Sequence, residues 1–233
     1  MKNIYAKMSL EMERGAGFLR VARLRFSLYD WHIISTLVER WRLKTHTFHL
    51  LDGECTITLQ DVAVLTGLSI DGRPIIASVR SDYLELCESL LGTSPEPPNI
   101  HYSLVRSSWF KEHFVELPPQ ANQMTLHRHT RAYILQLCSS IVFPTAATGK
   151  VSLQFLQFLE NMDLVGHYSW GAACLAWLYS HLCRASRLPL VAQMGGLVWL
   201  FQLWAWERFP FLAPTLHDRS IPSDAPLGHR YFI

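Results

Sequence analysis

The sequence has few charged side chains and no large excess of either sign. Asp, Glu, Lys and Arg make up 17% of its 233 residues, whereas hydrophobic residues make up 49%. This composition supplies enough apolar surface for a packed core and argues against long disordered tracts. The formal net charge is +2, so the chain as a whole has no electrostatic drive toward nucleic acid or an anionic membrane. Any charged binding site must therefore be local.

Cysteine is also scarce, and its spacing excludes two common uses. The five cysteines are odd in number, lie far apart and never form a C-x-x-C pair. A structural zinc site needs four ligands at close spacing, and a disulfide framework usually has an even number of cysteines. We therefore expect reduced cysteines that act as small buried hydrophobic residues. The first 24 residues lack the continuous apolar stretch of a secretory signal, so we expect an intracellular protein.

One uncharged stretch approaches the length that can span a bilayer. Residues 188–206 contain no formal charge, and a membrane helix needs about 20 predominantly apolar residues. The stretch includes Pro189 and the pair Gly195-Gly196, and no cluster of Lys or Arg marks one end of it. These features favour helices buried in a water-soluble core, and we expect no membrane association.

Sequence signatures of the common catalytic and nucleotide-binding sites are missing. There is no G-x-x-x-x-G-K-[ST] loop, and no G-x-G-x-x-G loop follows a strand. The stretch from Gly67 to Gly72 is one residue too long for the G-x-S-x-G turn of serine hydrolases. We therefore predict a chain that is not an enzyme and has no catalytic, cofactor-binding or metal-binding residue. If it were an enzyme, His127, His129 and Arg131 would be the only cluster to inspect.

Apolar residues recur at helical spacing through most of the chain and predict a mainly α fold. In residues 28–42, for example, apolar side chains return every three or four positions. The same spacing, with breaks at glycine and proline, predicts helices over 82–91, 103–114, 126–143, 151–162, 169–187 and 191–208. Thr58 to Asp61 has the pattern of a capping box and predicts a short helix that stops at Gly67.

A small β-hairpin is predicted near residues 45–58. Two β-prone runs flank Asp52-Gly53, a dipeptide that permits the positive φ of a tight turn. We expect a single compact multi-helix domain over residues 1–210 that contains this hairpin. Beyond it, Pro214, Pro222 and Pro226 disfavour regular helix. Residues 211–233 are therefore predicted to form a Pro-rich irregular tail.

The segment from Arg14 to Lys44 is the most basic part of the chain. Its seven basic residues against Asp30 and Glu39 leave a local charge of +5. Within it, Arg20 and Arg23 share a helical face and could contact the phosphates of DNA. A solvated face with ion pairs explains the same pattern, so direct DNA binding stays an alternative.

This alternative predicts a steep salt dependence. Each phosphate contact releases counterions, so the affinity for DNA should fall steeply between low and moderate salt. Fluorescence anisotropy of a labelled duplex over a range of NaCl concentrations measures the slope. A flat salt response would remove Arg20 and Arg23 as a phosphate-binding pair.

Several longer motifs, in a fixed order, resemble the plant mobile domain of the MAIN-like group. The similarity covers about residues 18–210 and is carried by the segments 37–42, 45–50, 53–54, 56–63, 67–68, 71–74, 131–133, 168–172, 182–185 and 202–210. They include Glu39-Arg40-Trp41-Arg42 and Trp204-Ala205-Trp206-Glu207-Arg208.

The resemblance implies a nuclear plant protein that acts in transposable-element silencing, gene regulation and meristem maintenance. It implies a protein partner such as a phosphatase of the plant protein-phosphatase-seven type, with DNA or chromatin as the other candidate. It supplies no catalytic residue. The motif residues that could contact a partner or hold the fold together are Glu39, Arg40, Trp41, Asp61, Arg73, Trp170, Glu207 and Arg208.

Overall fold

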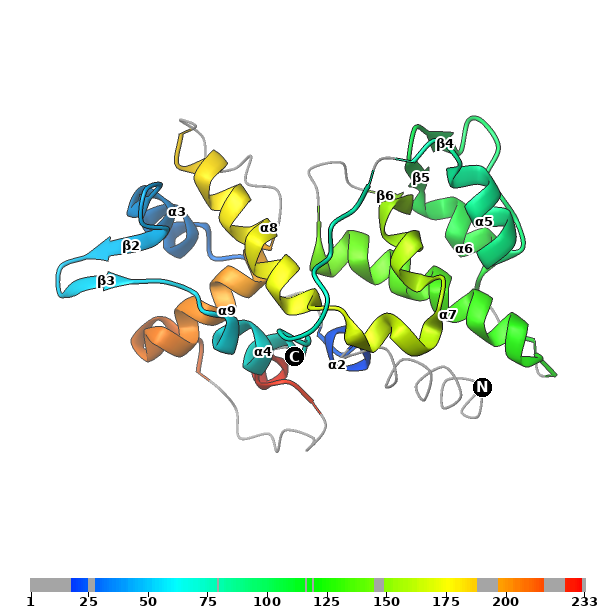
Figure 1. The fold of residues 1–233 in the computed structure, drawn as a ribbon. Helices are drawn as coiled ribbons and strands as arrows, with labels where there is room; N and C mark the ends of the chain where they lie inside the picture. Colours follow the sequence, from blue (N-terminus) through cyan, green and yellow to red (C-terminus); the bar gives the residue numbers. More distant parts are fainter. Residues whose placement is uncertain are drawn as a thin grey trace. The chain divides into compact units, whose positions relative to one another are not determined.

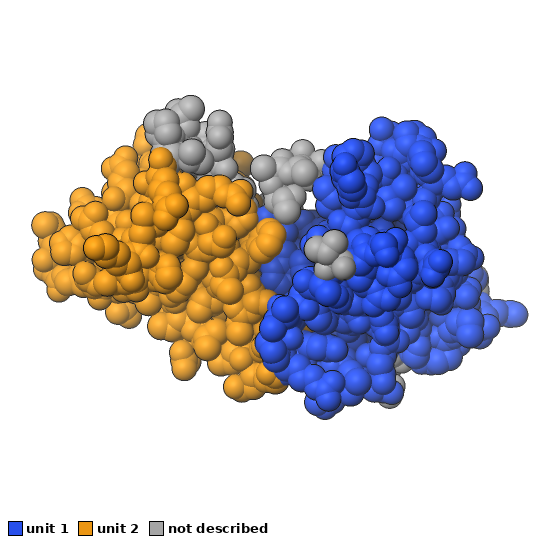
Figure 2. Space-filling view, turned by 45° about the horizontal axis from the view of Figure 1, so that its top comes forward, with its two compact units in different colours: residues 1–19, 73–168 blue, residues 20–72, 169–233 orange. Residues whose placement is uncertain are grey.

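Helices dominate the structure, and two small antiparallel sheets accompany them (Figure 1). The computed structural model describes residues 18–24, 28–78, 80–115, 117–118, 120–144, 149–187, 197–215 and 225–231. Contacts within the chain separate two compact units, coloured in Figure 2: unit 1 contains residues 1–19 and 73–168, and unit 2 contains residues 20–72 and 169–233. The predicted mainly α class with a small hairpin is confirmed.

Helix α3 belongs to unit 2, and an aspartate caps its first turn. The Asp30 carboxylate accepts hydrogen bonds from the backbone N–H groups of His32 and Ile33, at 3.0 and 3.2 Å. The first N–H groups of a helix have no acceptor within the helix, so Asp30 satisfies two of them. The helix spans Trp31–Glu39 and is shorter than predicted. It stops because the next residues, Trp41–Arg42, form strand β1 instead.

The first sheet has three strands in the order β1-β2-β3. Strands β2 (Thr47–Leu50) and β3 (Gly53–Cys55) form the predicted hairpin, and Gly53 at its turn has a φ of 131°. Strand β1 was not predicted, because Trp41 fits the helical spacing of the residues before it. Its pairing with Phe48 across the sheet overrides that local pattern.

Helix α4 (Leu59–Thr66) starts and ends as its sequence predicts. The Thr58 side chain accepts from the backbone N–H of Asp61, and the Asp61 carboxylate accepts from the backbone N–H of Thr58 at 2.8 Å. Gly67 ends the helix in the left-handed region, with a φ of 75°, which costs a glycine little. The capping box and the glycine stop are therefore confirmed.

Two long helices complete the core of unit 2. Helix α8 spans Trp170–Ala185 and helix α9 spans Val198–Arg208. Gly171 lets the start of α8 approach the backbone, since its N–H donates to the Ser69 carbonyl at 2.6 Å and a Cβ there would lie 3.0 Å from that oxygen. Residues 198–206 of α9 are all buried, whereas residues 188–196 of the uncharged stretch lie outside the described residues. None of the helices in the described ranges has the length and apolar character to cross a membrane.

The predicted tail contains two short 3-10 helices, η5 (Pro210–Leu212) and η6 (Leu227–Tyr231). The second packs on unit 2: Tyr231 lies 5.0 Å from the ring of Trp206, and Arg230 pairs with Glu207. Gly228 contacts the backbone of α4, where a Cβ would lie only 2.6 Å from the Leu65 carbonyl oxygen. The proposed domain boundary at residue 210 stays a prediction.

Unit 1 combines helices with a second sheet. Its α-helices are α5 (Tyr83–Leu91), α6 (Ser107–His113) and α7 (Gln123–Leu137), and α7 continues into a π-helix, η1 (Cys138–Val142). Its strands are β4 (Ile100–His101), β5 (Leu104–Arg106) and β6 (Lys150–Ser152), in the order β4-β5-β6. Two 3-10 helices follow, η2 (Leu153–Leu159) and η3 (Met162–His167). The short helix α2 (Phe18–Ala22) is divided between the units, with Phe18 and Leu19 in unit 1 and residues 20–22 in unit 2.

In unit 1, the helix predicted over 103–114 is confirmed for 107–113 but starts later than predicted, and the α-helix predicted over 151–162 is wrong. Residues 104–106 form a strand, and α6 starts only at Ser107; residues 151–162 form the end of β6 and then 3-10 helix. The strands are two or three residues long, and β5 pairs with β6 across more than 40 positions, as Val105 does with Val151. Such short, distant pairing leaves no local period in the sequence.

Arg131 joins three segments of unit 1. Its guanidinium donates to the backbone carbonyls of Leu159, Leu90 and Glu160, at 2.8, 3.2 and 3.0 Å. These oxygens belong to the ends of η2 and α5, where helices leave carbonyls without partners. Burial, with a smaller effect from Arg128, lowers the pKa of Arg131, but the carbonyls supply acceptors for the charge.

We predict that Arg131→Met lowers the free energy of unfolding by about 2–4 kcal/mol, because it leaves several carbonyls unsatisfied. Arg106→Met is the matched control, since Arg106 is exposed on β5, and should change stability by less than about 0.5 kcal/mol. Urea denaturation followed by circular dichroism measures both. Equal losses in the free energy of unfolding for the two variants would show that the hydrogen bonds of Arg131 do not stabilise unit 1 more than an exposed arginine does.

Candidate functional site

The junction between α3 and β1 carries three of the predicted motif residues. The four residues from Glu39 to Arg42 separate onto different faces: Trp41 is buried, whereas Glu39, Arg40 and Arg42 are exposed. Arg40 lines one surface recess, and Glu39 and Arg42 line another. In this segment the Trp41 side chain therefore packs in the core of unit 2, whereas the other three side chains lie on its surface.

Trp41 is the anchor. It is 3% exposed, and its indole N–H donates to the Cys183 sulfur of α8 at 3.3 Å. Its ring lies 4.9 Å from Phe48 and 5.2 Å from Tyr179. The Tyr179 hydroxyl in turn donates to the Ile57 carbonyl at 2.7 Å. Trp41 thus fixes the sheet to α8, which is the structural role weighed for it above.

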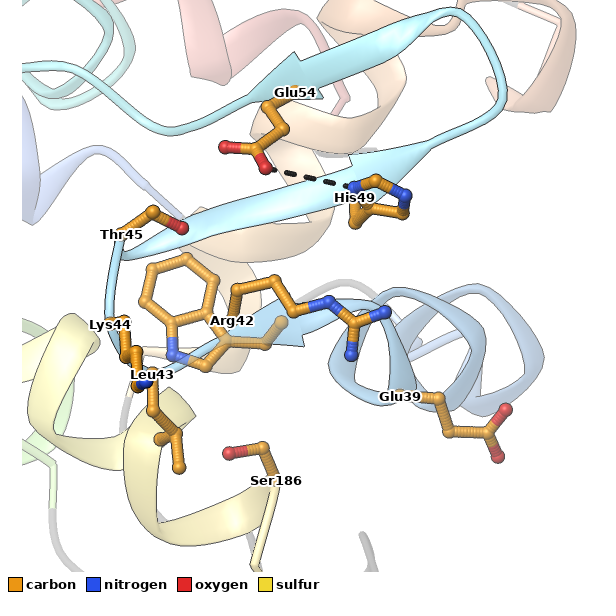
Figure 3. A pocket seen from close by; sticks show the side chains of 9 residues that line it. Glu39, Arg42, Leu43, Lys44, Thr45, His49, Glu54 and Ser186 are labelled. Carbon is orange, nitrogen blue, oxygen red and sulfur yellow. Dashed lines mark ion pairs between the residues drawn. The ribbon is translucent and has the colours of Figure 1, made fainter.

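The first recess, which we name the polar pocket, has a volume of about 600 Å³. Its lining comes from Glu39, residues 41–45, His49, Glu54 and Ser186 (Figure 3). Inside it, His49 Nδ1 lies 3.6 Å from Glu54 Oε1, and the Thr47 hydroxyl donates to the other Glu54 oxygen at 2.8 Å. The side chains of Arg42 and Lys44 also line it, so the pocket presents both signs of charge.

The second recess, which we name the apolar groove, has a volume of about 330 Å³. It lies between α3, the end of β2 and the segment after α9. Its apolar lining is Ile33, Leu37, Leu50, Phe209, Phe211 and Leu212, and its polar lining is His32, Thr36 and Arg40. Phe211 is 83% exposed. A recess with apolar walls and an exposed aromatic ring is typical of surfaces that bind another molecule.

The other motif residues do not gather around these recesses. Asp61 caps α4, Trp170 is fully buried at the start of α8, and Glu207 is paired with Arg230. Arg208 is exposed at the end of α9. Arg73 lies in unit 1, where its backbone N–H donates to the His167 carbonyl at 2.7 Å. A contact of any of them with a partner stays a prediction.

The two arginines of the DNA-binding alternative differ in exposure. Arg20 is exposed and Arg23 is half-buried. The aliphatic part of Arg20 covers Gly67, where a Cβ would lie 2.4 Å from its Cδ. Arg20 therefore packs on the end of α4, and its contact with phosphate stays a prediction.

The cluster of the enzyme alternative is spread along α7. His127 contacts Gln123 through its Nε2, and His129 contacts the Thr125 carbonyl through its Nδ1, at 2.8 and 3.0 Å. The Arg131 guanidinium donates its hydrogen bonds to backbone carbonyls of η2, α5 and Glu160. Within the described ranges, no three His, Cys, Asp or Glu side chains gather in a way that could hold a metal ion.

Sequence reasoning did not predict either recess. The polar pocket depends on β1, which the helical pattern concealed, and the apolar groove depends on η5 folding back beside α3. The sequence signal available for the groove was the run Phe209-Pro210-Phe211-Leu212, in which three large apolar residues surround a proline.

The fold and its recesses define a mainly α-helical domain with a candidate binding surface on unit 2. The chain belongs to the plant mobile domain family, whose sequence model matches residues 17–232. This confirms the resemblance drawn from the motifs. No solved structure matches the chain.

Three relatives come from Arabidopsis thaliana. The chain is 45% identical to the Serine/threonine-protein phosphatase 7 long form homolog over 192 residues, which cover 82% of this chain and 14% of that protein. It is 38% identical to Protein MAIN-LIKE 2, over 93% of this chain and 32% of that protein. It is 36% identical to Protein MAINTENANCE OF MERISTEMS, over 82% and 40%. The chain thus spans less than half of the length of each of these three relatives.

The geometry predicts different roles for two adjacent residues. Trp41→Ala should lower the free energy of unfolding by about 3–5 kcal/mol, because it empties a buried aromatic site. Arg40→Ala should change it by less than about 0.5 kcal/mol, because the Arg40 side chain is exposed. Chemical denaturation of both variants tests this. A large loss of stability with Arg40→Ala would place Arg40 among the structural residues instead.

Proposed function

We propose that this chain is a non-enzymatic protein-interaction domain that acts in the plant nucleus, in transposable-element silencing, gene regulation and meristem maintenance. The observation that carries the proposal is the apolar groove on unit 2, with its 83% exposed Phe211. Exposed aromatic and aliphatic side chains around a recess favour association with a protein over solvent. The polar pocket beside it adds charged side chains of both signs, which favour specificity.

The relatives support a phosphatase-related partner. One relative is named as a Serine/threonine-protein phosphatase 7 homolog, whereas two others carry MAIN-LIKE or MAINTENANCE OF MERISTEMS names. The same domain therefore occurs in a protein with a phosphatase name and in proteins without one. We propose that the chain acts together with a phosphatase of the protein-phosphatase-seven type or with another nuclear protein. The meristem role is suggested by the name of one relative.

Affinity purification of the tagged chain from plant nuclei, followed by mass spectrometry, tests this proposal. We expect a protein-phosphatase-seven-type phosphatase among the specific partners, retained after nuclease treatment. The matched control is a tagged Trp170→Ala chain, in which loss of a fully buried side chain should disturb unit 2 and reduce recovery. A set of recovered proteins that contains no phosphatase and is lost after nuclease treatment would contradict the proposal and favour binding to DNA or chromatin.

A further inference from the structure

We infer that the apolar groove binds a short protein segment that carries two bulky apolar side chains and one acidic side chain, with Arg40 as the partner of the acid. This inference rests on the proposed interaction function and adds the surface and the chemistry of the bound segment. All residues that line the groove belong to unit 2.

The walls of the groove select apolar side chains. Ile33 and Leu37 lie one turn apart on α3, and Phe209 and Phe211 face them from the segment after α9. The volume of about 330 Å³ is at the lower end of the roughly 300–1,000 Å³ that ligand pockets occupy. It accommodates a few side chains of a segment and not a folded surface.

One edge of the groove is polar, and its charge is positive. His32 and Thr36 on α3 and Arg40 at its C-cap follow one another at intervals of four residues, so they lie along one side of the helix. None of the residues that line the groove is acidic. A bound segment with a carboxylate at the Arg40 end would therefore meet a cation with no acidic neighbour in the groove wall.

The acidic side chains nearest to the groove residues along the chain do not line the groove. Asp30 caps α3, Glu39 lines the polar pocket, Asp52 is exposed at the tip of the hairpin, and Glu207 pairs with Arg230. An acid supplied by the bound segment is the charge that complements Arg40. An arginine with a carboxylate in a partly apolar site also forms stronger hydrogen bonds than in water.

Two other occupants are less compatible with the groove. Nucleic acid would require several cations over a polar surface, whereas six of the nine lining residues are apolar. A second copy of the chain could offer Leu51 and Asp52, which are both exposed at the tip of the hairpin. This occupant predicts dimerisation, and the experiment below separates it from a partner segment.

The test uses the full chain and a displayed library of random 12-residue peptides. We expect enriched peptides with two large apolar residues and one Asp or Glu. Synthetic versions should bind Arg40→Glu and Phe211→Ser at least about tenfold more weakly than the unaltered chain. Two matched controls should change the affinity less than about twofold: Arg187→Glu, which alters an exposed arginine outside both recesses, and Val64→Ser, which alters an exposed apolar residue on α4.

Several results would overturn the inference. They are the absence of enriched peptides, enrichment of basic peptides, and an equal loss of affinity in the control variants. Light scattering that shows a dimer abolished by Leu51→Ser would assign the groove to a second copy.

The same variants separate this inference from the proposed function. If Arg40→Glu and Phe211→Ser still recover the nuclear phosphatase, the groove is not its binding site but the interaction function stands. If the unaltered chain recovers no protein partner from nuclei, the proposed function fails whatever the peptides show.

Discussion

The stacking of Phe48 against α9 is the contact on which unit 2 depends. The Phe48 ring lies 5.4 Å from Phe201 and 5.1 Å from Trp204, and Trp41 packs on it at 4.9 Å. These rings bury a large apolar area between a sheet of very short strands and α9, whose residues 198–206 are all buried. Short strands alone are marginal in water, so the aromatic contacts hold the hairpin in place. The positions of Leu50 and Phe209, and hence the apolar groove, follow from that attachment.

The sequence predicted best what local chemistry decides. The capping box at Thr58, the glycine stop at Gly67 and the long helix α8 were predicted because caps, left-handed glycines and helical spacing are local signals. Strand β1, the second sheet and the division into two units were not, because they depend on pairing and packing between distant residues. The hairpin was predicted only in part. Asp52-Gly53 indicated its turn, but the third strand depends on the pairing of Trp41 with Phe48, which the sequence did not indicate.

The candidate site shows the same limit at the level of side chains. Arg40 and Trp41 belong to one sequence motif, but in the structure Arg40 is exposed and Trp41 is buried. Asp61, Trp170 and Glu207 likewise have contacts that explain their place in a motif without a partner. Burial distinguishes these residues, and burial depends on which elements pack together. The exposed residues that line the groove on both α3 and η5 form a set that only the fold assembles.

The groove between α3 and η5 is the proposed meeting point of unit 2 with a protein partner. Hydrogen–deuterium exchange of the chain, alone and with a purified protein-phosphatase-seven-type phosphatase, tests this proposal most directly. We expect slower exchange on binding in residues 32–40 and 209–212, with little change in α5 and α7 of unit 1. Protection confined to other segments, with those two unchanged, would contradict it.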